Sequence, residues 1–139
     1  MAFTPIQYDS GKLVDLPVAA TTFTKGDACN ENGEGYYEKA QAADGQMVTH
    51  VIMETVSDTA TLGDKHLFLR VDGVVFLADC NDVASRTDVG VSVNLASAGT
   101  VDPDSGADDV VFYIEDLVGK ADTTKVVRGW FNASDPMAN

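Results

Sequence analysis

The stretch that decides the fold reads His66-Leu-Phe-Leu-Arg-Val71, then Asp72-Gly73, then Val74-Val-Phe-Leu-Ala78. Two runs of apolar residues, several of them β-branched or aromatic, flank the dipeptide and are typical of β-strands. Asp-Gly supplies the positive backbone angles that a two-residue type I′ turn requires. We therefore predict a β-hairpin here.

The register of this hairpin follows from the turn. If Asp72-Gly73 is the turn, Leu69 faces Phe76, and Phe68 faces Leu77 on the opposite side. Both faces of the ribbon are then apolar. We expect one face to pack on the core and the other to meet a second element or another subunit, which makes Phe68 and Leu77 candidate subunit contacts.

Alternation of apolar and polar residues recurs along the rest of the chain. The clearest case is Val89-Gly-Val-Ser-Val-Asn-Leu95, a half-buried strand pattern. A single helical turn is predicted from Asn81 or Asp82 to Arg86. Further strand candidates, each ended by Gly, Asn, Asp or Pro, cover residues 11–16, 36–40, 48–56, 110–117 and 125–132.

These patterns predict an all-β protein, a small antiparallel barrel or sandwich with at most one or two short helices. The chain has 139 residues, 45% of them hydrophobic, which suits one domain with a core of its own. No linker or internal repeat divides it. We place an N-terminal arm at residues 1–10 and a single β domain at residues 11–139.

The N-terminal arm is uncharged up to Asp9 and carries the apolar or aromatic residues Phe3, Pro5, Ile6 and Tyr8. An extended segment of this kind can add a strand to the sheet edge of a partner. It can equally form a strand of the chain's own barrel. The sequence leaves both arrangements open.

Charge is distributed in two blocks. The net charge is -13; residues 27–64 hold eight acids and one base, and residues 102–116 hold six acids and no base. Such a chain would repel a phosphate backbone or an anionic membrane surface, so we expect no nucleic acid and no membrane as partner. We expect the acidic blocks to face solvent.

The sequence predicts no catalytic, cofactor or metal site. It lacks a nucleophile elbow and a phosphate-binding loop, and Cys29 and Cys80 cannot make a four-ligand zinc site. Buried free thiols are the commoner state of such a pair, with a disulfide as the alternative. Residues 102–109 place carboxylates like a calcium loop but lack the glycine and glutamate of an EF-hand, so a solvated turn is favoured over a loose calcium site.

The C-terminal strand candidate offers a contact surface. Alternation puts Val127 and Phe131 on one face, and Val126, Arg128 and Trp130 on the other. Trp and Arg are enriched at binding hot spots, so Arg128 and Trp130 join the candidate subunit contacts, with a half-buried sheet aromatic as the alternative for Trp130.

The chain resembles the phage head decoration proteins, also called capsid cement proteins. The likeness lies in the uncharged start from Met1 to Tyr8, the turn Phe23-Thr-Lys-Gly-Asp-Ala28, the strand pattern from Val89 to Leu95, and Val118-Gly-Lys-Ala121 before a last strand at 125–132. The acidic loop and the terminal Trp-Phe pair depart from the commonest small members.

This resemblance implies a non-enzymatic protein on the outer surface of the virion, assembled in the host cytoplasm. Copies, often trimers, would bind the expanded head and stabilise contacts between major capsid proteins. In such proteins the N-terminal arm commonly lies along the shell, which makes Phe3, Pro5, Ile6 and Tyr8 candidate capsid contacts.

Other classes of protein stay open. A β-sandwich carbohydrate-binding module could stack sugar rings on Tyr36, Tyr37 or Trp130. A small enzyme or ligand sensor could hold a pocket inside the barrel. Another phage structural part, such as a tail component, is the remaining alternative.

Overall fold

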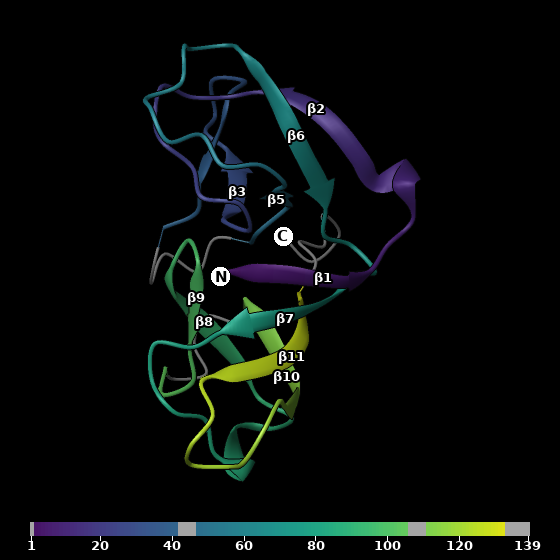
Figure 1. Ribbon diagram of the computed structural model, residues 1–139, viewed down its shortest axis with the longest axis vertical. Helices are drawn as coiled ribbons and strands as arrows, with labels where there is room; N and C mark the ends of the chain where they lie inside the picture. The colour runs from purple at the N-terminus through teal and green to yellow at the C-terminus, as the bar shows by residue number, and fades with distance from the viewer. Residues whose placement is uncertain (1, 42–46, 106–110, 133–139) are drawn as a thin grey trace.

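The computed structural model shows a small β sandwich, which confirms the predicted fold class. It describes residues 2–41, 47–105 and 111–132. Two antiparallel sheets lie one above the other along the long axis of the molecule, with β1 crossing between them (Figure 1). The sheets pack together without forming a closed barrel.

One sheet has six strands in the order β1-β7-β11-β10-β8-β9. Its strands are β1 (Phe3–Gln7), β7 (Val75–Asp79), β8 (Ser92–Ser97), β9 (Thr100–Asp102), β10 (Phe112–Leu117) and β11 (Val126–Phe131). A parallel bridge between Cys80 and Val101 brings the edge strand β9 back beside the end of β7, so the sheet curls strongly.

The other sheet has five strands in the order β2-β6-β5-β3-β4. Its strands are β2 (Leu13–Pro17), β3 (Ala28–Glu31), β4 (Tyr37–Lys39), β5 (His50–Ile52) and β6 (Lys65–Arg70). Two single 3-10 turns, η1 (Ser10–Lys12) and η2 (Arg86–Asp88), are the helical elements of the described residues. The helical turn predicted to end at Arg86 instead begins at Arg86. Ser85 and Asp88 form a capping box that fixes this start.

The predicted hairpin is wrong. β6 and β7 belong to different sheets: Leu69 pairs with Leu13 and Val51, whereas Phe76 pairs with Pro5 and Gly129. The chain crosses from one sheet to the other at the predicted turn.

The backbone at the turn explains this crossing. Val74 N donates to Val71 O at 3.1 Å, and Gly73 has φ +73°, but Asp72 is not among the described non-glycine residues with positive φ. A type I′ turn needs positive φ at both central positions, and positive φ at the second alone is the pattern of a type II turn. The turn therefore does not return β7 alongside β6.

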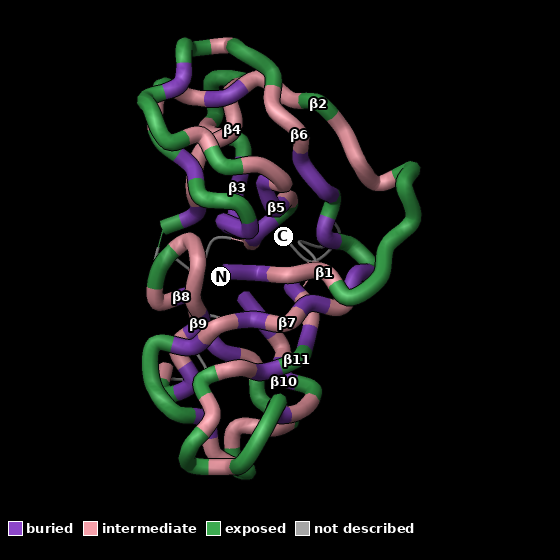
Figure 2. Tube along the Cα trace, in the orientation of Figure 1, coloured by how far each residue is buried: buried purple, intermediate pink, exposed green. Residues whose placement is uncertain are grey.

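The five-stranded sheet is covered on both faces, which is why β6 is apolar on both sides. Leu69 and Val51 belong to the larger core between the two sheets, while their neighbours Phe68 and Ile52 belong to a smaller core on the other face. The segments before β3 and before β6 close that smaller core, joined by the bridge between Phe23 and Val56. Buried segments gather along the middle of the molecule and exposed loops at its two ends (Figure 2).

The N-terminal segment forms a strand of the chain's own sheet, one of the two arrangements that the sequence left open. β1 pairs with β7 of the chain's own sheet, and Phe3 is 1% exposed. The Phe3 ring lies 4.7 Å from the ring centroid of Phe131 and 5.7 Å from that of Phe112. Pro5 is tolerated because β1 is an edge strand.

Phe3 anchors β1, so we expect Phe3→Ala to lower the free energy of unfolding by about 3–5 kcal/mol, the range for large aromatic deletions in cores. Ile6→Ala on the same strand removes a side chain that is 52% exposed and should change stability by less than about 0.5 kcal/mol. Urea unfolding of both variants measures the difference. Equal losses would contradict the placement of Phe3 in the core.

Gly129 lets β10 and β11 approach each other. A Cβ added there would lie 1.8 Å from Tyr113 O and 2.9 Å from Phe112 Cε2, closer than atoms can pack. We therefore expect Gly129→Ala to destabilise the protein by about 1–3 kcal/mol or more, because backbone must move.

Gly11→Ala is the matched control for Gly129→Ala. The nearest atom to an added Cβ at Gly11 is Asp9 Oδ1 at 3.4 Å, an ordinary contact. Thermal melts of the two variants should differ clearly, and a Gly129→Ala midpoint equal to that of Gly11→Ala would show that the strands do not approach this closely.

Candidate functional site

The outward face of the six-stranded sheet collects the strongest candidate contact residues. Burial alternates along β11, where Val127 and Phe131 are buried and Arg128 is exposed, as the sequence predicted. The same alternation turns Leu77 of β7 and Tyr113 of β10 outward. We call the outward side chains of β7, β10 and β11 the outer face: Val75, Leu77, Asp79, Tyr113, Glu115, Val126, Arg128 and Trp130.

Cross-strand pairing organises the outer face. Trp130 is the Cα partner of Tyr113, and their rings stack with centroids 4.7 Å apart and an interplanar angle of 24°. Arg128 is the Cα partner of Leu77, and its Nε donates to Glu115 Oε1 at 2.9 Å. The aromatic pair thus lies beside a neutralised arginine in one continuous row.

A second ion pair borders this face. Arg86 of η2 donates to Asp116 Oδ1 at 3.0 Å. The backbone N–H of Leu117 and then the Arg86 guanidinium lower the pKa of Asp116 below its usual range. In a chain of net charge -13, these two pairs balance each arginine with one carboxylate, and Asp79 adds a further acid to the face.

The candidate subunit contacts predicted from the sequence separate into two groups. Leu77, Arg128 and Trp130 lie together on the outer face. Phe68 does not join them, because it is 0% exposed in the smaller core and packs near Tyr37. The prediction of a subunit contact by Phe68 is corrected: the second element that covers it comes from the same chain.

The candidate capsid contacts also separate. Phe3 is buried in the larger core, so its predicted capsid contact is corrected as well. Ile6 lies beside Arg128 around a shallow hollow that joins β1 to the outer face. Pro5 and Tyr8 line a different hollow together with Lys25, and Tyr8 is 39% exposed.

Sequence reasoning missed Tyr113, Glu115 and Val75 as members of the outer face. Tyr113 and Glu115 lie in the strand predicted at 110–117, and their alternation with Ile114 was a usable signal. That alternation does not indicate that β10 pairs with β11, which is what stacks Tyr113 on Trp130.

The tyrosines proposed for sugar binding lie elsewhere. Tyr37 is half-buried, with its ring 4.9 Å from that of His50 and 5.6 Å from that of Phe68. One face of Trp130 is covered by Tyr113. The structure therefore does not bring Tyr37 and Trp130 onto one platform.

Both cysteines are free and buried, as the sequence favoured. Burial raises the pKa of the Cys29 thiol far above its usual range, and burial followed by the nearby Asp79 raises that of Cys80 to about 12. Both thiols therefore stay protonated and weakly nucleophilic at neutral pH.

The described ranges contain no group of three or more His, Cys, Asp or Glu side chains that could hold a metal ion. In the proposed calcium loop, Asp102 Oδ1 accepts from Asp104 N at 3.0 Å, and Ser105 Oγ donates to Asp102 O. These bonds form a turn. Asp108 and Asp109 of that loop lie outside the described residues.

In the part of the chain that the structure describes, no helix has the length and apolar character needed to span a membrane. Comparisons with protein-family models, with curated proteins and with solved structures found no match to this chain.

His50 gives the fold a pH dependence. Burial and then the positive charge of Arg70 lower the pKa of His50 to about 4, below the value of about 6.5 expected in the unfolded chain. Above pH 6.5 His50 is neutral in both states. As the pH falls from about 6.5 to 4, the unfolded chain gains a proton that the folded chain does not, so stability falls.

We expect His50→Gln to reduce this loss of stability, because glutamine does not titrate. The measurement is the midpoint of urea unfolding at several pH values between 7 and 4, plotted as the difference between variant and parent. A constant difference across this range would show that His50 does not contribute.

Proposed function

We propose that this chain is a non-enzymatic decoration protein of a bacteriophage head. It binds the outside of the expanded capsid and stabilises contacts between major capsid proteins, as a trimer on the shell. The observation that carries the proposal, beside the resemblance described above, is the outer face: an aromatic pair and an arginine on an otherwise acidic molecule.

Charge supports an interface at the outer face. Two copies of a chain with net charge -13 repel each other, so contact is favoured where charges are already paired. The ion pairs of Arg128 with Glu115 and of Arg86 with Asp116 supply such paired charges. Trp, Tyr and Arg are also the residues enriched at interface hot spots.

The acidic surface lies elsewhere and supports the same role. Four acids of the first block, Glu31, Glu34, Asp58 and Asp64, are exposed on loops or strand ends of the five-stranded sheet. Mutual repulsion between such surfaces would keep coated particles apart. Within this block Asp27 is buried, and Glu38 and Glu54 are half-buried.

Fewer residues of the N-terminal arm are available for a capsid contact than the sequence suggested. Because Phe3 belongs to the core, deletion of residues 1–8 would disturb the fold as well as any capsid contact. Ile6 and Tyr8 are the exposed apolar side chains of this segment, and we assign the capsid contact of the arm to them.

We expect Arg128→Gln and Trp130→Ala each to weaken binding to expanded heads of the phage that encodes the chain by about tenfold or more, the size of a hot-spot effect. Co-sedimentation of the purified protein with such heads measures the occupancy. Glu34→Gln, on an exposed turn of the other sheet, is the control and should bind as the parent does.

Thermal melts of the free variants accompany this test, because Trp130 is half-buried. The side chains of Arg128 and Glu115 are 45% and 41% exposed, so their ion pair contributes little to stability and Arg128→Gln should fold normally. Full occupancy by a folded Arg128→Gln protein would exclude the outer face from binding. No binding of the parent protein would overturn the proposed function itself.

A further inference from the structure

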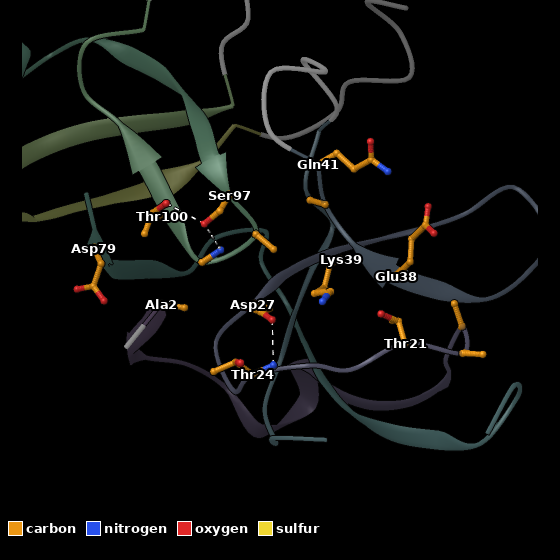
Figure 3. Close-up of a pocket in the computed structure, with 15 residues that line it drawn as sticks. Ala2, Thr21, Thr24, Asp27, Glu38, Lys39, Gln41, Asp79, Ser97 and Thr100 are labelled. Atoms are coloured by element: carbon orange, nitrogen blue, oxygen red, sulfur yellow. Dashed lines mark hydrogen bonds between the residues drawn. The ribbon is translucent and has the colours of Figure 1, made fainter. Parts of the chain in front are cut away.

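A cleft of about 830 Å³ is lined by residues of both sheets (Figure 3). It runs along the outer edge of β4 and is closed by the segment after β2 and by the turn between β8 and β9. Much of its wall is made of residues with small side chains or none, including Ala2, Ala40, Ala98 and Gly99. Small side chains leave room for another chain to approach the backbone.

Asp27 lies in the wall of this cleft and is only 8% exposed. Its Oδ2 accepts from Thr24 N at 2.9 Å (Figure 3). Its Oδ1 accepts no hydrogen bond from the described residues, and a Cβ added at Gly99 would lie 3.3 Å from it. The missing side chain of Gly99 thus leaves this oxygen open toward the cleft.

Asp27 Oδ1 faces the cleft with no donor from the described residues, and a cationic donor is the partner that forms the strongest hydrogen bonds with a carboxylate. Glu38 and Asp79 also line the cleft, against the single base Lys39 among its described lining residues. The hydroxyl groups of Thr21 and Thr100 add acceptors. A ligand with several N–H donors and a positive charge fits this surface.

The backbone groups at the edge of β4 favour a peptide as the positively charged ligand. Ala40 N donates to Ala28 O and Asn32 N donates to Tyr36 O, so the even-numbered residues of this strand bond to β3. The peptide groups of Tyr37 and Lys39 therefore point to the opposite edge. Tyr37 O accepts from Ala19 N there, and Lys39, whose peptide groups point to the same edge, lines the cleft.

We propose that the cleft binds an extended segment of a different protein through an arginine whose guanidinium donates to Asp27 Oδ1. The planar guanidinium offers five donors in a fixed arrangement, which suits a carboxylate surrounded by further acceptors better than an ammonium does. The segment adds main-chain hydrogen bonds at Lys39, the mode of β-strand addition. This proposal concerns another surface than the outer face and does not depend on the proposed function.

The experiment titrates the isotope-labelled full chain with the peptide acetyl-Thr-Val-Arg-Val-Thr-amide and follows backbone amide signals by NMR. We expect saturable shifts at Thr24 and Gly99. The same peptide with citrulline in place of arginine keeps the shape but loses the charge, and it should bind about tenfold more weakly. Equal binding of the two peptides would overturn the proposal.

Asp27→Asn tests the carboxylate itself. The asparagine oxygen can still accept from Thr24 N, so the loop should fold, while the arginine peptide should bind about tenfold more weakly. Asp58→Asn removes the same charge from an exposed position and should leave binding unchanged. If Asp27→Asn unfolds, the comparison of the arginine and citrulline peptides on the parent chain still tests whether binding requires the positive charge.

Sedimentation of the same proteins tests the alternative that a second copy of this chain occupies the cleft. We expect Asp27→Asn to leave the self-association of the chain unchanged. Loss of self-association by this variant, with no binding of the arginine peptide, would assign the cleft to a second copy and overturn the proposal.

Discussion

The fold depends on covering β6 on both faces. Phe68 and Leu69 are both fully buried, and neighbouring residues of a strand point to opposite sides, so no single core can cover them. The larger core takes Leu69 and the smaller core takes Phe68. This requirement places β6 inside the five-stranded sheet and sends the next strand, β7, to the other sheet.

The crossing after β6 also positions the outer face. Once β7 lies in the six-stranded sheet, it pairs with β1 on one side and β11 on the other. Phe3 then enters the larger core, and Leu77 pairs with Arg128 on the opposite face. One sheet therefore both closes the core and presents the aromatic and arginine side chains that the proposed function uses.

The two candidate surfaces differ in their physical character. The outer face is aromatic and charge-paired, which suits contact with large protein surfaces. The cleft is acidic and holds the open oxygen of Asp27, which suits a single cationic side chain on an extended segment. Asp27 shows why net charge alone is a poor guide: it lies within the acidic block expected to face solvent, yet it is buried.

The sequence by itself determined the all-β class, the approximate positions of most strands and the alternation that exposes Arg128, because each depends on local periodicity or composition. It favoured the buried free thiols, and it did not predict β3 or β9. Only the tertiary structure decided which strands pair. It buried Phe3 and Phe68, stacked Tyr113 on Trp130 and opened the cleft beside Asp27. Pairing joins residues far apart in the chain, and a two-residue turn such as Asp72-Gly73 can serve a hairpin or a crossing according to one backbone angle that tertiary packing sets.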